Sequence, residues 1–500
     1  MRKDLSSSLL PQDSLLKDAL DTLNRGAFGV VFFEDKEKRV VGVMTDGDMR
    51  RAFLKGAKLE SPVGDYVKRN FVSGKSSAPH EKNIRLLSDE IHHLPILDEN
   101  GRLVDFLSWS DIWRLPVMEP TLGGNEMKYV VDCIATNWIS SQGSYVKTFE
   151  KSFSSFLSMD YALTTSNGTC ALHLALLALE LGPGDEVIVP DLTFAASANA
   201  VIHAGAKPVL VDVSGKHWGM DPGCVEAAIT RKTKAIMPVH LYGHPCEMEP
   251  LIKLAKTHRL SIVEDCAEAL GAQYKGRKVG TFGDISCFSF FSNKVITTGE
   301  GGMVVTNHEK LNHKMAILRD HGMSRSRRYW HETVGFNYRM TNLQAAVGLA
   351  QLEQIDRFLK NRRQIAGIYA AQLKDIKGIT LPPEMPWAQN IYWLYSILID
   401  SSIVGAEPEE LRKGLEREGI ETRAFFYPLH QQPPYLSRRH FPVTERLVSQ
   451  GLSLPSGNGL KFEEIVRVCR ALKEQIEHHR IVRRVRADHG KLKKSLLLKG

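Results

Sequence analysis

The sequence predicts an α/β protein with a large, mostly parallel sheet domain, a small C-terminal α/β subdomain, and an α+β module in front of both. Three observations support this. Short β-branched runs alternate with helical stretches through the middle of the chain, the first part contains an internal repeat, and the pattern becomes more mixed after Trp387. The expected segments are an N-terminal module, a linker, a large domain, a small domain and a basic tail, at 1–115, 116–127, 128–386, 387–478 and 479–500.

The composition is that of an ordinary globular protein. Of the 500 residues, 43% are hydrophobic and 24% charged, which allows a large buried core. No apolar run reaches the roughly 18–20 residues of a membrane span, and the N-terminus lacks the apolar segment of a signal peptide. The seven cysteines are dispersed without a C-x-x-C pair, so we expect reduced thiols, a cytoplasmic location and no metal site.

The net charge of +8 is concentrated at the C-terminus. Between Arg480 and the end of the chain, eight Lys and Arg residues face one acid, Asp488. Such a tail can contact nucleic acid or an anionic membrane surface. A solvated, partly helical extension is the simpler interpretation, and nucleic-acid binding is not expected.

The N-terminal 115 residues contain two copies of one pattern. Each copy reads as a helix, a strand, a charged turn, a second strand and a polar turn into another helix. The four expected strands are Val30–Phe33, Val40–Met44, Leu94–Leu97 and Leu103–Leu107.

Two motifs within these copies, G-V-M-T-D-G-D-M-R (42–50) and F-L-S-W-S-D-I (106–112), resemble a pair of cystathionine-β-synthase (CBS) domains. The resemblance implies that an adenine nucleotide binds between the repeats, its ribose held by Thr45 and Asp48 in the first and by Ser108 and Asp111 in the second. Asp105 replaces the glycine usual in the second motif. The alternative is that these residues only cap helices, since Ser, Thr and Asp are preferred there.

From about residue 120 the chain alternates between strands and helices. The expected buried parallel strands are 186–190, 208–213, 234–241 and 261–266. Beyond Trp387, a strand at 396–400, a helix from Glu407 and an aromatic loop at 424–435 indicate the smaller subdomain.

Two features point to a ligand site at one edge of this sheet. The turn T-T-S-N-G-T (164–169) runs into an apolar helix, so the backbone N–H groups of Asn167–Thr169 can face an anion. Asp265 ends a buried strand, and the carboxyl ends of parallel strands line the ligand crevice of open α/β sheets. Asp265 could instead cap a helix that follows it.

Lys294 lies between the strand-like C-F-S-F-F and the glycine-rich T-T-G-E-G-G. Glycines before the lysine at the phosphate-loop spacing are absent, which excludes that motif. Two readings remain: an ion pair with a buried carboxylate, or covalent attachment of pyridoxal phosphate (PLP), whose ring nitrogen a carboxylate would keep protonated.

Eight motifs in the same order resemble the DegT–StrS nucleotide-sugar aminotransferases, which have the aspartate-aminotransferase-like fold (fold type I of PLP enzymes). They are W-I-S-S-Q-G (138–143), T-S-N-G-T (165–169), P-D-L-T-F-A-A-S (190–197), H-L-Y-G-H (240–244), E-D-C-A-E-A-L-G-A (264–272), F-S-F-F-S-N-K-V-I-T-T-G-E-G-G (288–302), G-F-N-Y-R-M-T-N-L-Q-A-A (335–346) and F-F-Y-P-L-H (425–430).

The resemblance implies two catalytic residues: Lys294 as the PLP-linked lysine and proton shuttle, and Asp265 as partner of the pyridine nitrogen. It also implies contacts of the cofactor ring and phosphate with Asn167, Gly168, Thr169, Phe194, Glu268, Ser289 and Asn337. Asn337 would reach the phosphate across the interface of a homodimer or larger homo-oligomer. Many members have glutamine or histidine at the place of Glu268. A glutamate there makes the bond to the ring hydroxyl only if its carboxyl is protonated, and the alternative is that it faces the substrate.

Three stretches look closest to enzymes that aminate C4 of GDP-4-keto-6-deoxymannose with L-glutamate, for cell-surface polysaccharide. They are 139–150, 191–213 and 288–306. A UDP- or dTDP-linked keto sugar is the alternative substrate. A second alternative is a regulatory protein that has lost catalysis, but the presence of Lys294, Asp265 and the phosphate residues together favours an enzyme.

Overall fold

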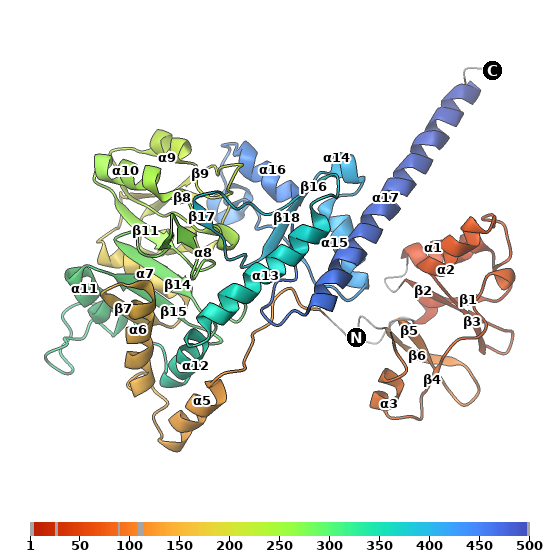
Figure 1. The fold of residues 1–500 in the computed structure, drawn as a ribbon, viewed down its shortest axis with the longest axis horizontal. Coiled ribbons are helices and arrows are strands. Elements are labelled where there is room, and N and C mark those ends of the chain that lie inside the picture. Colours follow the sequence, from red (N-terminus) through yellow and green to blue (C-terminus); the bar gives the residue numbers. More distant parts are fainter. Residues whose placement is uncertain (1–4, 26–28, 89–90, 109–114, 498–500) are drawn as a thin grey trace. The chain divides into compact units, whose positions relative to one another are not determined.

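The computed structural model describes residues 5–25, 29–88, 91–108 and 115–497, and the chain divides into two compact units (Figure 1). The first unit consists of 1–115 together with 412–421, and the second of 116–411 together with 422–500.

The first unit contains two three-stranded sheets of the same design. In each, the first strand is parallel and the third antiparallel to the central one, in the orders β1-β2-β3 and β4-β5-β6. The elements are β1 (Leu9–Pro11), α1 (Leu16–Arg25), β2 (Val30–Glu34), β3 (Val40–Thr45), α2 (Asp46–Leu54), β4 (Gly74–Lys75), α3 (His80–Ile84), β5 (His93–Leu97) and β6 (Leu103–Ser108). The four predicted strands are confirmed, and the helix expected at the end of the second copy lies mostly outside the described residues.

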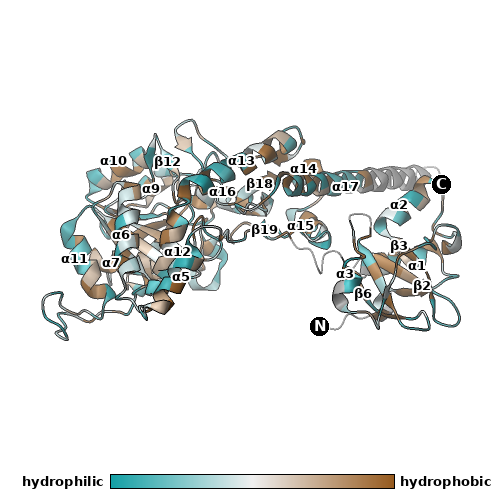
Figure 2. Ribbon diagram, turned by 60° about the horizontal axis from the view of Figure 1, so that its bottom comes forward, coloured by the Kyte–Doolittle hydropathy of each residue, from teal (hydrophilic) through white to brown (hydrophobic). Residues whose placement is uncertain are grey.

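The two sheets share an apolar core. The rings of Phe32 on β2 and Phe106 on β6 lie 5.4 Å apart, and both side chains are fully buried. Residues of β2 and β3 are coloured mostly as hydrophobic in Figure 2, as expected for strands covered by helices and by the second sheet. The repeats therefore bury each other's apolar faces.

A seven-stranded sheet forms the centre of the second unit, in the order β7-β15-β14-β11-β10-β8-β9. Its strands are β7 (Tyr161–Thr165), β8 (Glu186–Pro190), β9 (Lys207–Val211), β10 (Thr233–Ile236), β11 (Ser261–Asp265), β14 (Ile285–Ser289) and β15 (Gly302–Thr306). Only β15 runs antiparallel to its neighbours. The parallel strands were predicted, but β10 ends well before the expected residue 241, close to Pro238, which has no N–H for a ladder.

Helices cover both faces of this sheet (Figure 1). The helices that pack on its strands are α6 (Ser144–Leu157), α7 (Gly168–Ala178), α8 (Ala196–His203), α9 (Pro222–Ala228), α10 (Met248–His258) and α11 (Glu309–Arg319). Helix α12 (Asn342–Leu352) packs on α6 and on α5 (Glu126–Ala135), and α13 (Ile355–Leu373) follows α12. Helix α7 is apolar on all sides and almost wholly buried, so its first turn is fixed rigidly against the sheet.

The C-terminal part adds an antiparallel sheet in the order β16-β18-β20-β19, and a small sheet β13-β12-β17 lies beside the large one. The strands are β12 (Gln273–Tyr274), β13 (Arg277–Lys278), β16 (Ile379–Thr380), β17 (Ala388–Gln389), β18 (Tyr395–Ile399), β19 (Arg423–Ala424) and β20 (Gly451–Leu454). The helices are α14 (Ser401–Val404), α15 (Pro408–Arg417), α16 (Pro442–Gln450) and α17 (Phe462–Leu497), the last of which includes most of the basic tail. Among the described helices, none has the length and apolar character needed to cross a bilayer.

Candidate active site

Lys294 lies at the carboxyl edge of the large sheet, near two buried carboxylates. Asp265 is the last residue of β11, while Glu268 lies in the turns that follow and Lys294 in the turn beyond the end of β14. No helix follows Asp265, so the capping alternative is wrong. The Lys294 Nζ atom is 3.9 Å from Glu268 Oε1.

Asp265 is 5% exposed and held by two short hydrogen bonds. The Ser197 hydroxyl donates to Oδ2 at 2.8 Å, and the Ala267 N–H donates to Oδ1 at 3.1 Å. Burial raises the pKa of Asp265, although these bonds and the charge of Lys294 oppose the shift. Within the described part of the chain, Asp265 has no ion-pair partner, so this anion is suited to a cation supplied by a ligand.

Glu268 is a buried acid whose two oxygens face different groups. The Tyr242 N–H donates to Oε2 at 2.9 Å, and Oε1 faces Lys294. Burial raises the pKa of Glu268 to about 7, against the opposing effects of Lys294 and the Tyr242 N–H. At neutral pH this carboxyl is therefore poised between its protonated and ionised forms.

The Lys294 side chain is 13% exposed, and its partial burial lowers its pKa, against the attraction of Glu268 and Asp265. Lys294 Nζ lies 3.9 Å from the centre of the Trp393 ring. A buried amine with a lowered pKa is more often in the neutral, nucleophilic form than an exposed lysine.

The start of α7 lies against the end of β14. Asn167 caps the helix, its side chain accepting the Cys170 N–H at 2.8 Å. A Cβ at Gly168 would lie 2.8 Å from the Cβ of Ser289, so only glycine lets the helix start approach the end of β14. The first turn of α7, whose backbone N–H groups are not bonded within the helix, therefore lies close to Ser289.

The other two predicted cofactor residues lie apart from these contacts. Phe194 is 59% exposed, with its ring 5.7 Å from that of Phe426. Asn337 is exposed, and its Oδ1 accepts the Arg339 Nε–H at 3.2 Å.

Sequence reasoning missed two residues that touch the site. Ser197, which binds Asp265, stood within the quoted motif P-D-L-T-F-A-A-S, where a hydroxyl after the aromatic was the available signal. Trp393 carried no signal, because only the fold brings it to Lys294, 99 positions away in the sequence.

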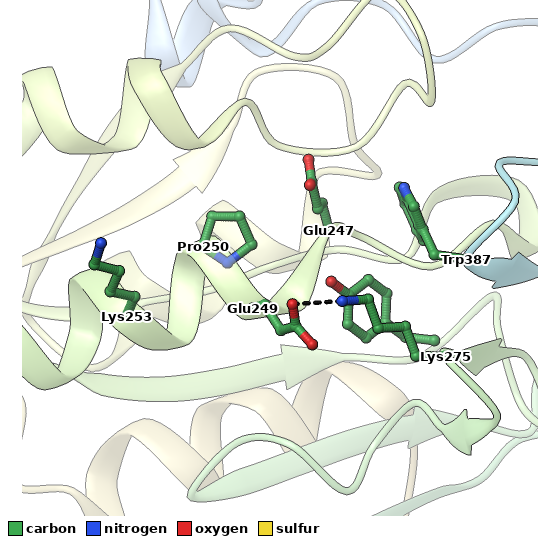
Figure 3. Close-up of a pocket in the computed structure, with 7 residues that line it drawn as sticks. Glu247, Glu249, Pro250, Lys253, Lys275 and Trp387 are labelled. Carbon is green, nitrogen blue, oxygen red and sulfur yellow. Dashed lines mark hydrogen bonds and ion pairs between the residues drawn. The ribbon is translucent and has the colours of Figure 1, made fainter.

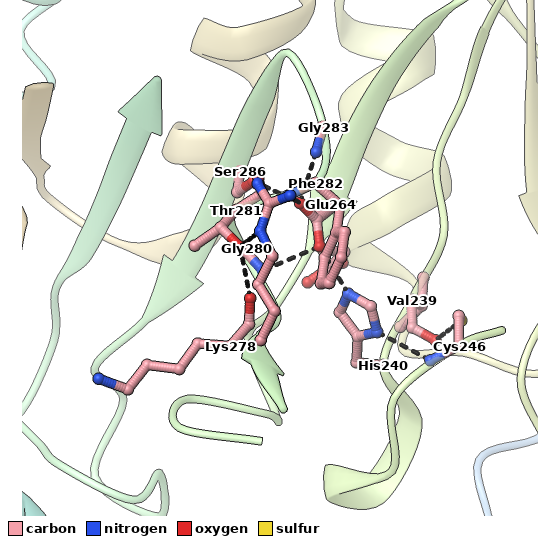
Figure 4. A network of polar contacts seen from close by, with 12 residues as sticks. Val239, His240, Cys246, Glu264, Lys278, Gly280, Thr281, Phe282, Gly283 and Ser286 are labelled. Carbon is pink, nitrogen blue, oxygen red and sulfur yellow. Dashed lines mark hydrogen bonds and ion pairs between the residues drawn. The ribbon is translucent and has the colours of Figure 1, made fainter. Parts of the chain in front are cut away.

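A third buried carboxylate, Glu264, precedes Asp265 on β11 and is the centre of a network of hydrogen bonds (Figure 4). It accepts three backbone N–H bonds at 2.7–2.8 Å, the Ser286 hydroxyl at 3.1 Å and the His240 Nε2–H at 3.1 Å; the N–H donors are Gly280, Phe282 and Gly283. The Cys246 N–H donates to His240 Nδ1 at 3.0 Å, which fixes the tautomer. Glu264, His240 and Cys266 are close enough to bind a metal ion, but the carboxylate is already saturated by hydrogen bonds. This network is a structural anchor.

A surface pocket lies elsewhere on the second unit, by α10 (Figure 3). None of the predicted cofactor residues lines it. Its lining residues are Glu247, Glu249, Pro250, Lys253, Tyr274, Lys275 and Trp387.

In the first unit, Thr45 and Asp48 form a reciprocal capping box at the start of α2. The Thr45 hydroxyl accepts the Asp48 N–H, and the Asp48 carboxylate accepts the Thr45 N–H. Asp48 also pairs with Arg51 at 2.5 Å. Ser108 is buried at the end of β6, and Asp111 lies outside the described residues.

The order of the large sheet and the lysine beyond β14 define a fold type I PLP-dependent enzyme. Solved structures match the chain. DesV of S. venezuelae, in complex with a ketimine intermediate, has 37% identity and a TM-score of 0.67, covering 71% of this chain and 94% of its own. Spr1654 of Streptococcus pneumoniae, solved in its PLP form, has 29% identity and a TM-score of 0.69, covering 73% of this chain and 100% of its own.

The family is shown by a family model and by curated relatives. The model described as the DegT/DnrJ/EryC1/StrS aminotransferase family matches residues 120–473, and the CBS domain model matches 1–55 and 63–112. This chain belongs to the DegT/DnrJ/EryC1/StrS aminotransferase family and is a PLP-dependent sugar aminotransferase that carries CBS domains. The resemblances seen in the sequence are thereby confirmed.

Two relatives are similar over nearly their whole length. The GDP-perosamine synthase of Escherichia coli O157:H7 is 48% identical over 361 residues, which is 72% of this chain and 98% of that protein. The GDP-perosamine synthase of Caulobacter vibrioides is 47% identical over 366 residues, or 73% and 98%.

Proposed function

We propose that this enzyme transfers the amino group of L-glutamate to C4 of GDP-4-keto-6-deoxymannose, supplying an amino sugar for cell-surface polysaccharide. The observation that carries the chemistry is Lys294, a largely buried amine 3.9 Å from Glu268 and near the buried carboxylate of Asp265, which has no ion-pair partner among the described residues. The GDP-sugar assignment is supported by the 44–48% identity to three GDP-perosamine synthases. A different nucleotide carrier has no comparable support.

The site residues fit PLP. Asp265 would hold the proton of the pyridine nitrogen, for which its burial and fixed orientation by Ser197 are suited. The first turn of α7, from Asn167 to Thr169, and Ser289 would bind the phosphate, where the close approach at Gly168 leaves no room for a side chain. Phe194 would cover one face of the ring.

PLP, when bound, supplies an electron sink for the carbon that loses or gains a proton. Lys294 would attach the cofactor and, once released, move a proton at its Nζ between the reacting carbons. Glu268 would, in its protonated form, donate to the ring hydroxyl. In its ionised form it would hold the Lys294 ammonium.

We further propose a homodimer in which Asn337 reaches the phosphate of the other subunit. Helix α5 and the residues after it expose apolar side chains at helical spacing: Met127, Val131, Ile134 and Trp138 are 53–76% exposed. A second copy of the chain would cover this face. Asn337 is exposed, as such a role requires.

For the first unit, we propose an adenine nucleotide as ligand and regulator. Thr45, Asp48, Ser108 and Asp111 would hold its ribose. In the capping box, the Thr45 hydroxyl and the Asp48 carboxylate are already hydrogen-bonded to the start of α2. These are the groups that would bind the ribose, so nucleotide binding would compete with the cap. We also place the enzyme in the cytoplasm, in keeping with seven free cysteines.

The test is an amination assay with purified protein, PLP and L-glutamate across GDP-, UDP- and dTDP-linked 4-keto-6-deoxy sugars, with and without ATP or AMP. We expect turnover with the GDP sugar and none with Lys294→Ala. Turnover of only the UDP or dTDP sugar would refute the substrate, and failure to exchange amino groups between glutamate and 2-oxoglutarate would refute the activity.

A further inference from the structure

Trp393 contacts the lysine segment twice. It lies between β17 and β18, is 3% exposed, and its indole Nε1–H donates to the backbone oxygen of Asn293 at 2.7 Å. The face of the same ring lies 3.9 Å from Lys294 Nζ. One side chain therefore holds both the backbone just before the lysine and the end of its side chain.

Trp393 is itself held by contacts to its backbone and its ring. The buried Arg362 donates to the Trp393 backbone oxygen at 3.0 Å. Gly243, with φ of +101°, packs so closely that a Cβ there would lie 2.7 Å from the Trp393 nitrogen. The ring of Tyr242 stacks on the indole at 6.4 Å. The position of Trp393 is thus set by contacts independent of Lys294.

Charged groups reach Lys294 from several elements. Glu268 and Asp265 attract its protonated form, and Arg423 on β19 repels it. The negative face of the Trp393 ring adds to the attraction, because the face of an indole stabilises a cation that is partly removed from water.

We propose that Trp393 is a positioning residue for Lys294, which holds the free amine in reach of the cofactor whenever the two are not covalently joined. This rests on the proposed role of Lys294 as the PLP-linked lysine. The indole N–H would fix where the lysine emerges, and the ring face would fix where its amine rests and how readily it keeps a proton.

The test separates these two contributions. Trp393→Phe keeps an aromatic face but loses the N–H, Trp393→Leu loses both, and Trp387→Phe makes the same exchange at the surface pocket (Figure 3). In the cofactor-free protein, the pKa of Lys294 is measured by competitive amine labelling and peptide mass spectrometry. The capture of added PLP is then followed by absorbance.

We expect Trp393→Leu to lower the Lys294 pKa by roughly 0.4–1.5 units, because it removes the ring that favours the ammonium. Trp393→Phe should leave that pKa within a few tenths and weaken PLP capture about 2–10-fold, the effect of losing one hydrogen bond. Trp387→Phe should match the wild type in both measurements.

Folding of both Trp393 variants is checked by circular dichroism. If a folded variant keeps both the wild-type Lys294 pKa and the wild-type PLP capture, the inference is overturned. A wild-type protein that binds no PLP at Lys294 would instead overturn the proposed function. A loss of stability alone, with the pKa and capture unchanged, would mean that Trp393 is only a core residue.

Discussion

Replacing Glu268 with glutamine removes a charge beside Lys294 without changing the shape of the side chain. The Tyr242 N–H bond to Oε2 can be kept by the amide oxygen. The affected pair is the Glu268 Oε1 and Lys294 Nζ atoms, which lie 3.9 Å apart, on side chains that are 5% and 13% exposed. The variant therefore isolates the electrostatic effect of this acid on the lysine.

The size of that effect follows from the distance. Two unit charges about 4 Å apart attract by about 4 kcal/mol at an effective dielectric constant of about 20, which corresponds to about 3 pKa units. Because the pKa of Glu268 is itself about 7, the two groups titrate together and the full charge is not always present. We expect Glu268→Gln to lower the Lys294 pKa by about 1–3 units.

The assay is competitive labelling of Lys294 in the cofactor-free protein across neutral and alkaline pH, with Glu249→Gln as the control. Glu249 pairs with Lys275 at the surface, with their charged groups 2.5 Å apart (Figure 3). Glu249→Gln therefore makes the same exchange of an acid for an amide in a different place. A Lys294 pKa that stays constant or rises in Glu268→Gln would refute the proposed coupling.

Further predictions concern stability, cofactor binding and assembly. Burial raises the Glu268 pKa from 4.5 to about 7, so ionisation of this acid lowers the stability of the folded protein as the pH rises from 4.5 to about 7. Above about pH 7, thermal or denaturant unfolding should show Glu268→Gln to be more stable than the wild type by up to about 3 kcal/mol. Gly168→Ala should weaken PLP binding at least tenfold in an absorbance titration, while Gly182→Ala, whose Cβ would meet only a backbone oxygen at 4.0 Å, should not. Val131→Asp, on the exposed face of α5, should shift the protein from dimer to monomer in sedimentation analysis; a dimer that persists contradicts that interface. Arg362→Met should cost about 2–4 kcal/mol in denaturant unfolding, because it leaves the Trp393 and Ser456 oxygens without their donor.

Much of the fold could be predicted because its local signals agree with the tertiary structure. The strand Glu186–Pro190 was predicted to the residue, since a run of buried β-branched side chains ends there at a proline. The antiparallel direction of β15 was not predicted, because a buried strand reads alike in either direction.

The site was predictable where chemistry is carried by one residue in a motif. Lys294, Asp265 and Gly168 follow from the sequence, and the structure places them at one edge of the sheet. Contacts between distant segments could not be predicted in the same way. Trp393 reaches the lysine from beyond the large sheet, and nothing in its own neighbourhood in the sequence indicates this.

The central claim is that Lys294 is the residue that attaches PLP. The most direct measurement is borohydride reduction of the PLP-loaded protein, followed by peptide mass spectrometry. We predict that the mass of a reduced phosphopyridoxyl group is found on the peptide that contains Lys294, and that Lys294→Ala carries none there. A label on another lysine, or no stable label on a wild-type protein that is yellow with PLP, would contradict the account.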